Sequence, residues 1–346
     1  MRKRASTRSI ALGMALVVAC IAIAATIGWA ASSLSGAGAT FPYPLYSKWF
    51  EVYRKERKVE ISYQAIGSGG GIKQLKAGTV DFGASDAPLS NQEAKEMPSA
   101  VLHIPTVAGA VVVAYNLQSV PKGLKLTGEV IADLFLGNIK RWNDKRIAAL
   151  NPGVTLPNTA VAVVHRSDGS GTSYIFTGYL SAVSRAWAVR VGTGKSVNWP
   201  AGIGGKGNAG VAGIVKQTPG AVGYVELAYA EQSKLPYAYI RNRADKFIEP
   251  AIASTTAAAA SSVKAMQKDV RASIVNAAGD NAYPIAGFTY LLVYQRQRDA
   301  EAGRELVRFL DWAIHDGQKY AAPLLYAPLP EQLVALNEAT IKKITF

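Results

Sequence analysis

Residues 165–173 have the sequence HRSDGSGTS and place a cation, an anion and several hydroxyl groups at the start of a helical period. The guanidinium of Arg166 is suited to an oxyanion, because it donates two parallel hydrogen bonds to one ion. A helix that begins here adds free N–H groups and partial positive charge, and its first residues are Ser170, Gly171 and Thr172. Asp168 either orients Arg166 or caps the helix, and the sequence leaves both roles open. The stretch predicts an oxyanion-binding site.

Two further helical periods also begin at a hydroxyl residue beside glycine or proline. Thr40 precedes FPYPLYSKWF, and Ser68 precedes GGGIKQLKAG. Each residue alone is consistent with an ordinary helix N-cap, since Ser and Thr are favoured there. Three such starts in one chain favour a shared anion site, because each helix N-terminus offers N–H donors. Glycine also removes the Cβ that would keep a ligand away from the backbone.

Asp86, in TVDFGASDAPLS, stands where a predicted strand gives way to a turn. A carboxylate repels most anions, so it is tolerated in an anion site only where the ligand brings a proton to donate. Phosphate carries one or two protons at neutral pH, whereas sulfate carries none. We therefore expect Asp86 to select phosphate over sulfate.

The motifs of nucleotide binding and hydrolysis are incomplete. GTGKS has Val189 where a phosphate-binding P-loop requires glycine, and GAGATF has Phe41 where a dinucleotide fingerprint has its third glycine. Neither GSGGG nor DGSGT has the spacing of a nucleophile elbow. The three histidines lack metal-ligand spacing; they are His103, His165 and His315. We therefore expect neither an enzyme nor a cofactor or metal site.

Strand-like and helical patterns alternate along the chain. Apolar or alternating runs cover residues 59–66, 79–85, 109–116, 159–165 and 220–228. Between them, one helix face carries Leu45, Trp49, Val52 and Tyr53, and another carries Ile175, Tyr179, Leu180 and Val183. This alternation predicts an α/β fold with largely parallel sheets, in which ligands bind where strands end and helices begin. Residues 192–210 form a long glycine-rich loop of a kind that is usually functional or disordered.

The first thirty residues have the pattern of a secretory signal peptide. Basic residues precede an apolar run at 10–27, and cleavage is expected after Ala30 or Ala31. Two alternatives remain open. The run approaches the ~20 residues that span a bilayer and would then be retained as an anchor. Lipidation at Cys20, the only cysteine, is the other.

Composition and net charge limit the classes of protein and of binding partner that remain possible. With 346 residues, of which 49% are hydrophobic and 18% charged, the chain is globular and long enough for two domains. Its formal net charge of +14 attracts anions in general. The dense basic run at residues 54–58 is expected to be a solvated helix end. No nucleic-acid-binding motif is recognisable, so nucleic acid is not an expected partner.

Four segments together resemble a known family. In chain order they are GAGATFPYPLYSKW, YQAIGSGGGIKQLKAGTVDFGASDAPLS, HRSDGSGTS and GGKGNAGVAGIVKQTPGAVGYVELAYA, and the likeness runs from about residue 36 to 330. The chain is similar to the periplasmic phosphate-binding proteins of Pst-type high-affinity phosphate ABC importers, which are type 2 periplasmic binding proteins. The resemblance implies an α/β, two-domain venus-flytrap fold. Each domain would be a mixed, mostly parallel sheet flanked by helices, with two hinge crossovers between the domains.

The resemblance also implies a set of phosphate-binding residues: Thr40, Phe41, Ser68, Asp86, Arg166, Asp168, Ser170, Gly171 and Thr172. In this set Asp86 matches the proton-accepting carboxylate, and Asp168 matches the acid that orients Arg166. Two positions depart from the family. Gly69 stands where many members have serine, and His165 precedes the arginine where a second basic residue is common.

The implied hinge crossovers fall near residues 106–116 and 283–294. After a signal peptide at 1–30, domain I would comprise residues 32–113 and 287–346, and domain II residues 114–286. The expected function is binding of inorganic phosphate between the domains by a periplasmic monomer, which delivers it to the permease subunits of a membrane ABC importer. The alternative is a secreted phosphate-ester hydrolase, which a metal site or an activated nucleophile would favour.

Overall fold

The computed structural model describes residues 33–346, so the predicted signal peptide and Cys20 lie outside the described residues. The strands are β1 (Ser33–Gly38), β2 (Glu60–Ala65), β3 (Phe82–Ser85), β4 (Val101–Tyr115), β5 (Lys125–Leu126), β6 (Ala162–Arg166), β7 (Ile203–Gly205), β8 (Ala221–Glu226), β9 (Tyr239–Arg241), β10 (Phe247–Ile248) and β11 (Ala286–Tyr294). The helices are α2 (Tyr43–Arg57), α3 (Ser68–Ala77), α4 (Asn91–Lys95), α5 (Gly128–Phe135), α6 (Lys145–Leu150), α7 (Gly171–Val183), α8 (Arg185–Arg190), α9 (Gly207–Gln217), α10 (Leu227–Gln232), α11 (Ile252–Lys268), α12 (Ala300–Ile314) and α13 (Glu331–Ile341), with 3-10 helices η1 (Asp316–Tyr320) and η2 (Ala322–Leu324).

One mixed sheet of eight strands runs through the molecule in the order β2-β1-β3-β11-β4-β8-β6-β7, and helices flank it. The expected α/β fold with mixed sheets is therefore confirmed. Parallel pairing is confined to the two outer parts, β2-β1-β3 and β8-β6-β7. The central strands β11 and β4 pair antiparallel with each other and with their neighbours. A smaller sheet has the order β10-β9-β5.

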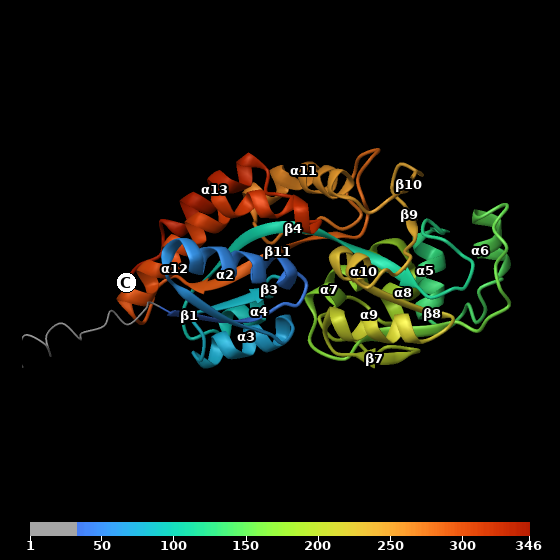
Figure 1. Cartoon of the computed structure of the whole chain (residues 1–346), viewed down its shortest axis with the longest axis horizontal. Helices are drawn as coiled ribbons and strands as arrows, with labels where there is room; N and C mark the ends of the chain where they lie inside the picture. The colour runs from blue at the N-terminus through green and yellow to red at the C-terminus, as the bar shows by residue number, and fades with distance from the viewer. Residues whose placement is uncertain (1–32) are drawn as a thin grey trace, which may run out of the picture.

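Strand β4 joins two lobes (Figure 1). Its residues 101–110 pair with β11, and residues 111–115 pair with β8. We call lobe I the part built on β1, β2, β3 and β11, and lobe II the part built on β6, β7, β8 and the smaller sheet. Helix α11 packs against β4, β11 and α13. The domain boundaries expected at residues 113 and 287 stay predictions.

A β-bulge interrupts the pairing of β11 with β4. Thr289 pairs with Val107 and Tyr290 pairs with Pro105, so Thr106 is the additional residue on β4. Proline has no N–H to donate to the neighbouring strand, which gives a physical reason for a register shift at this point. Thr289, beside the bulge, donates a hydrogen bond to Asp86 in the loop that follows β3.

Each lobe has an aromatic core beside the sheet. In lobe I, α2 buries Trp49 and Phe50 against Phe309 and Trp312 of α12. In lobe II, Phe176 of α7 stacks on Tyr224 of β8 with ring centroids 4.2 Å apart. Burial of such a side chain contributes about 1.5–3 kcal/mol, so these contacts fix the helices against the strands. Among residues 33–346, no helix has the length and apolar character needed to cross a membrane.

The parallel strands of both lobes end facing the same interlobe region. In lobe I the chain leaves β1, β2 and β3 and enters the loops around Thr40, Ser68 and Asp86. In lobe II it leaves β6, β7 and β8 and enters α7, α9 and α10. This is the position at which α/β folds bind ligands, because helix N-termini gather there.

Candidate functional site

Two of the predicted hydroxyls reach across the interlobe region instead of capping their own helices. Ser68 Oγ accepts hydrogen bonds from the N–H of Gly171 at 3.0 Å and from the N–H of Asp86 at 3.3 Å. Thr40 Oγ1 accepts from the side-chain amide of Asn208 at 2.9 Å and from its backbone N–H at 3.2 Å. The N-cap interpretation is therefore wrong for Thr40 and Ser68, and each hydroxyl joins lobe I to a helix start of lobe II.

The start of α7 brings lobe II close to Asp86. Ser170 is an ordinary N-cap, because its Oγ accepts from the N–H of Ser173 at 3.0 Å. Gly171 follows, and a Cβ at this position would lie 2.5 Å from Oδ2 of Asp86 and 2.6 Å from Oγ of Ser68. Only glycine permits this approach, so the glycine serves contact between the lobes as well as access to the backbone N–H.

Arg166 forms a bidentate ion pair with Asp168. Nε donates to Oδ1 at 2.8 Å and Nη2 donates to Oδ2 at 2.6 Å, and the guanidinium is almost fully buried. Nη1 donates to Oγ1 of Thr172 at 3.2 Å. Asp168 also accepts the N–H of Gly207 at the start of α9, at 3.0 Å. Asp168 therefore fills both roles that the sequence left open. It orients Arg166, and it caps a helix, but this helix is α9 and not the helix α7 that follows Asp168 in the sequence.

The pKa of Asp168 reflects this pairing. Burial alone would raise it, but the hydrogen bonds and charge of Arg166 outweigh burial and hold the pKa below its usual range. Asp168 therefore stays ionised and neutralises part of the charge of Arg166, while the guanidinium stays fixed in one orientation.

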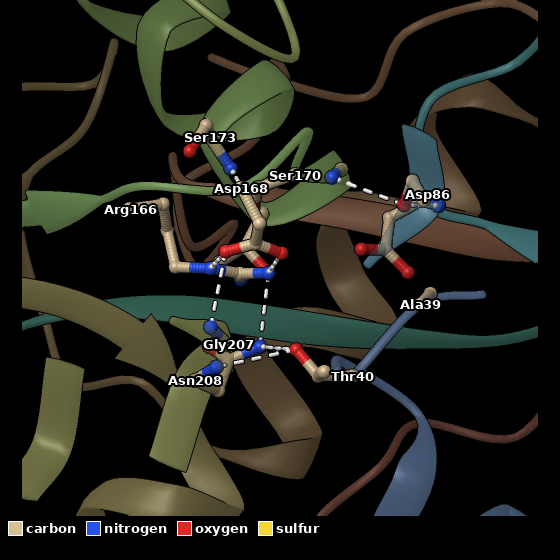
Figure 2. Close-up of polar contacts among 12 residues, drawn as sticks. Ala39, Thr40, Asp86, Arg166, Asp168, Ser170, Ser173, Gly207 and Asn208 are labelled. Carbon is tan, nitrogen blue, oxygen red and sulfur yellow. Dashed lines mark hydrogen bonds and ion pairs between the residues drawn. The ribbon is translucent and has the colours of Figure 1, made fainter. Parts of the chain in front are cut away.

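Asp86 faces this pair from lobe I (Figure 2). It is buried, and burial raises the pKa of its carboxyl to about 7, against the opposing effects of a hydrogen bond from Thr289 and the charge of Arg166. Oδ1 accepts from the hydroxyl of Thr289 at 2.8 Å. A buried carboxylate opposite a buried guanidinium is suited to a ligand with both acceptor oxygens and a proton to donate.

The side chain of Phe41 lies in the core. Its ring is fully buried, and a Cβ at Gly109 would lie 2.6 Å from the ring. Its carbonyl accepts from the hydroxyl of Tyr326 at 2.7 Å, and the carbonyl of Thr40 accepts from the hydroxyl of Tyr229 at 2.6 Å. The two tyrosines thus fix the loop that follows β1.

Asn208, a residue that the sequence analysis did not select, links both lobes. It is fully buried, and its Nδ2 lies 2.9 Å from Oγ1 of Thr40 and 3.1 Å from Oγ1 of Thr172, while Oδ1 accepts the N–H of Glu226 at 2.9 Å. The available signal was its position in the long glycine-rich loop, at the start of a helix. Thr289 was also missed; it is the single serine or threonine within the largely apolar strand β11.

The two departures from the family pattern have local explanations. Gly69 donates its N–H to the carbonyl of Gly169 at 2.8 Å, and a Cβ at Gly69 would lie 3.2 Å from Cα of Gly169. Glycine at both positions therefore permits close backbone contact between lobes. The ring of His165 stacks on Trp199, with centroids 4.9 Å apart and planes 7° from parallel.

Two pockets are lined in part by residues of the candidate site. One, of about 540 Å³, is lined from lobe I by Thr40 and Tyr43 and from lobe II by Asp168 and Lys206. The other, of about 210 Å³, reaches Asp86 from the side of β11 and Arg271. The larger pocket has a lysine and helix N-termini at its lining, which favours entry of an anion. Among residues 33–346, no group of three or more His, Cys, Asp or Glu side chains is placed to hold a metal ion.

The chain matches a family model described as PBP superfamily domain over residues 25–316. It is 46% identical to the phosphate-binding protein PstS of Xylella fastidiosa (strain 9a5c), with 88% of this chain and 84% of that protein covered. It is 44% identical to the phosphate-binding protein PstS of Pasteurella multocida (strain Pm70), with 90% of each covered.

A solved structure of a high-affinity periplasmic phosphate-binding protein, PfluDING, bound with phosphate, has the same fold. It aligns with a TM-score of 0.70 at 21% identity over 89% of this chain and 93% of that chain. At this identity the likeness concerns the fold, and the two-lobed binding-protein architecture is confirmed by it. The family model and the sequence relatives span most of the chain, and the chain therefore belongs to the PBP superfamily and, within it, to the family of PstS phosphate-binding proteins.

Proposed function

We propose that this protein binds inorganic phosphate between its two lobes and delivers it to a membrane ABC importer. One observation carries the proposal: the buried guanidinium of Arg166 in lobe II faces the buried carboxyl of Asp86 in lobe I (Figure 2). Helices of both lobes begin around these two groups. The relatives named PstS phosphate-binding proteins support the same ligand.

Each part of the candidate site has a role toward the anion. The guanidinium of Arg166, already oriented by Asp168, donates to ligand oxygens, and the N–H groups at the starts of α3 and α7 add further donors. The hydroxyls of Thr40, Ser68, Ser170 and Thr172 complete the donor set, with the backbone of Phe41 and Gly171. Asp86 accepts the proton of the ligand. No covalent step is involved.

The ligand closes the lobes because it needs donors from both. A binding protein that closes in this way presents one compact face to a transporter, so the proposed partners are the permease subunits of an importer. In this proposal the protein acts as a monomer in the periplasm. The predicted signal peptide at residues 1–30 would direct it there.

The test is calorimetry on protein that has been unfolded, freed of bound anions and refolded. Inorganic phosphate should bind with one site per chain and with higher affinity than sulfate at neutral pH. Ligand at a hundredfold excess over its Kd should stabilise the fold by about 2.7 kcal/mol. Absence of phosphate binding by stripped, correctly refolded protein would refute the proposal.

A further inference from the structure

Thr289 makes the only side-chain hydrogen bond to the Asp86 carboxylate that the described residues show. Its Oγ1 donates to Oδ1 at 2.8 Å, across 203 positions of sequence, and both side chains are buried. Thr289 lies on the central strand β11, whereas Asp86 follows β3, which is the neighbouring strand. The bond therefore fixes a loop carboxylate to a central strand of the sheet.

This hydrogen bond decides which carboxylate oxygen faces the ligand. Oδ1 is engaged by Thr289, and Oδ2 points toward Gly171, where an added Cβ would lie 2.5 Å from it. Gly171 is the first residue of α7, so Oδ2 is aimed at the helix start that offers N–H groups to an anion. A carboxylate rotated away from this orientation would not present an acceptor to the proton of the ligand.

The β-bulge described above places Thr289. Its carbonyl accepts from Oγ1 of Thr106, the additional residue of the bulge, at 3.2 Å. Thr106 Oγ1 in turn lies 2.8 Å from the hydroxyl of Tyr46 on α2. Buried residues on α2, β4 and β11 thus hold the strand segment that carries the donor, and the hydroxyl of Thr289 has one fixed partner.

The other charged and titratable groups around Asp86 have mixed effects on its proton. Arg166 favours the ionised form, while Asp168 disfavours it and Glu226 is a second buried acid nearby. Arg271 lines the pocket on the side of β11. Five tyrosines close enough to interact electrostatically have their pKa values raised by burial and stay neutral; they are Tyr46, Tyr63, Tyr229, Tyr290 and Tyr326. A hydroxyl that donates directly to the carboxylate favours its charged form.

We infer that Thr289 is the positioning residue for anion selectivity: it holds Asp86 as an ionised acceptor with Oδ2 toward the ligand, so that protonated oxyanions are admitted and fully deprotonated ones are rejected. The inference rests on the proposed function and names the residue that sets its selectivity.

Loss of the hydroxyl has a specific consequence for pH dependence. Sulfate is repelled by ionised Asp86 but accepts a hydrogen bond from its protonated form. Above the pKa of Asp86, sulfate binding therefore requires proton uptake, and its affinity falls about tenfold per pH unit. A hydrogen bond to a charged group contributes at least about 1.5 kcal/mol, so its removal should move this fall upward by at least about one pH unit.

The experiment measures the Kd of sulfate and of phosphate by calorimetry from pH 5 to pH 9 on stripped protein. Thr289→Val keeps the shape of the side chain and removes the hydroxyl, and Thr289→Ser keeps the hydroxyl. Thr255→Val is the matched control, because it removes a similarly buried hydroxyl, on α11, that makes no hydrogen bond to Asp86. Thr289→Ala replaces the valine variant if that variant does not fold.

We expect the midpoint of the sulfate profile to rise by at least about one pH unit in Thr289→Val, and to stay at the wild-type value in Thr289→Ser and Thr255→Val. Phosphate should then be preferred over sulfate at least about tenfold less at neutral pH in Thr289→Val. Weaker binding of both anions with an unmoved midpoint would show a merely structural role and overturn the inference. A wild-type protein without preference for phosphate at any pH would instead refute the proposed function.

Discussion

The backbone N–H of Gly171 donates a hydrogen bond of 3.0 Å to Oγ of Ser68, so the first residue of α7 in lobe II meets the first residue of α3 in lobe I. Two further contacts of this kind accompany it, from Gly69 to Gly169 and from Asn208 to Thr40. The structure is therefore that of a closed clamp, and three of the residues that join the lobes, Thr40, Ser68 and Gly171, are also proposed to hold the ion.

Phosphate should contract the stripped protein in solution, because donors from both lobes can reach one ion only when the lobes are closed. Small-angle scattering with and without phosphate measures the change. Gly171→Leu is the informative variant, since its side chain would enter the space occupied by Asp86 and Ser68. We expect this variant to stay open. An identical radius of gyration in wild type with and without phosphate would argue against a clamp.

Replacing Arg166 should weaken phosphate binding in two distinguishable steps. Arg166→Lys keeps the charge but loses the planar fork held by Asp168, so affinity should fall. Arg166→Ala should cost about 2–5 kcal/mol, as expected for truncation of a buried charge pair. Calorimetry on stripped protein measures both, and Arg146→Ala, in an exposed ion pair with Asp133, serves as the control without effect. Equal affinity of Arg166→Ala and wild type would remove Arg166 from the site.

Asp86→Asn should increase the affinity for sulfate relative to phosphate. The amide removes the repulsion of a deprotonated anion and offers it a donor, whereas the proton of phosphate loses its acceptor. Competition of both anions against labelled phosphate, on wild type and variant, gives the ratio directly. If the ratio does not change, Asp86 is a structural acid at the end of a strand.

Asp86 should also make the ligand-free protein less stable as pH rises. Its pKa is raised from 3.8 to about 7 on folding, so the native state binds the extra proton between these values. This contribution to the free energy of unfolding is fully present below about pH 4 and is lost as pH rises through about 7, with an upper limit of about 4 kcal/mol.

Urea unfolding of wild type and Asp86→Asn from pH 4 to pH 8 checks this sign. The difference between the two curves isolates Asp86, since Glu226, whose pKa burial also raises, is present in both. Parallel curves would mean that the carboxyl of Asp86 titrates alike in folded and unfolded protein.

A half-buried ion pair at the rim should help to keep the clamp closed. Lys195 in lobe II donates to both oxygens of Glu93 on α4 in lobe I, at 2.6 and 2.8 Å. Lys195→Met should weaken phosphate binding about fivefold, for a pair that contributes up to about 1 kcal/mol, and less at high salt. Lys76→Met is the matched control, because the Lys76–Glu96 pair lies within lobe I. The same loss in both variants would exclude an interlobe role.

The sequence by itself determined which residues are proposed for the anion site and which fold carries them. A guanidinium, an adjacent carboxylate and hydroxyl residues at helix starts are local patterns, and their chemistry follows from residue type and spacing. The alternation of strand and helix periods in the same way predicted an α/β fold, because periodicity is also a local property. The structure brings all nine predicted residues to one interlobe region, while their roles as ligands stay a proposal.

The tertiary structure alone decided how these residues contact one another. Ser68 and Thr40 had the local pattern of helix caps, yet their hydroxyls accept from Gly171 and Asn208, which are 103 and 168 positions away. Asp86 owes the orientation of its carboxylate to Thr289, which comes beside it only because β3 and β11 are neighbours in the sheet. The partner of a buried polar group is set by which strands and helices pack together, and such packing between distant segments leaves no local signal in the sequence.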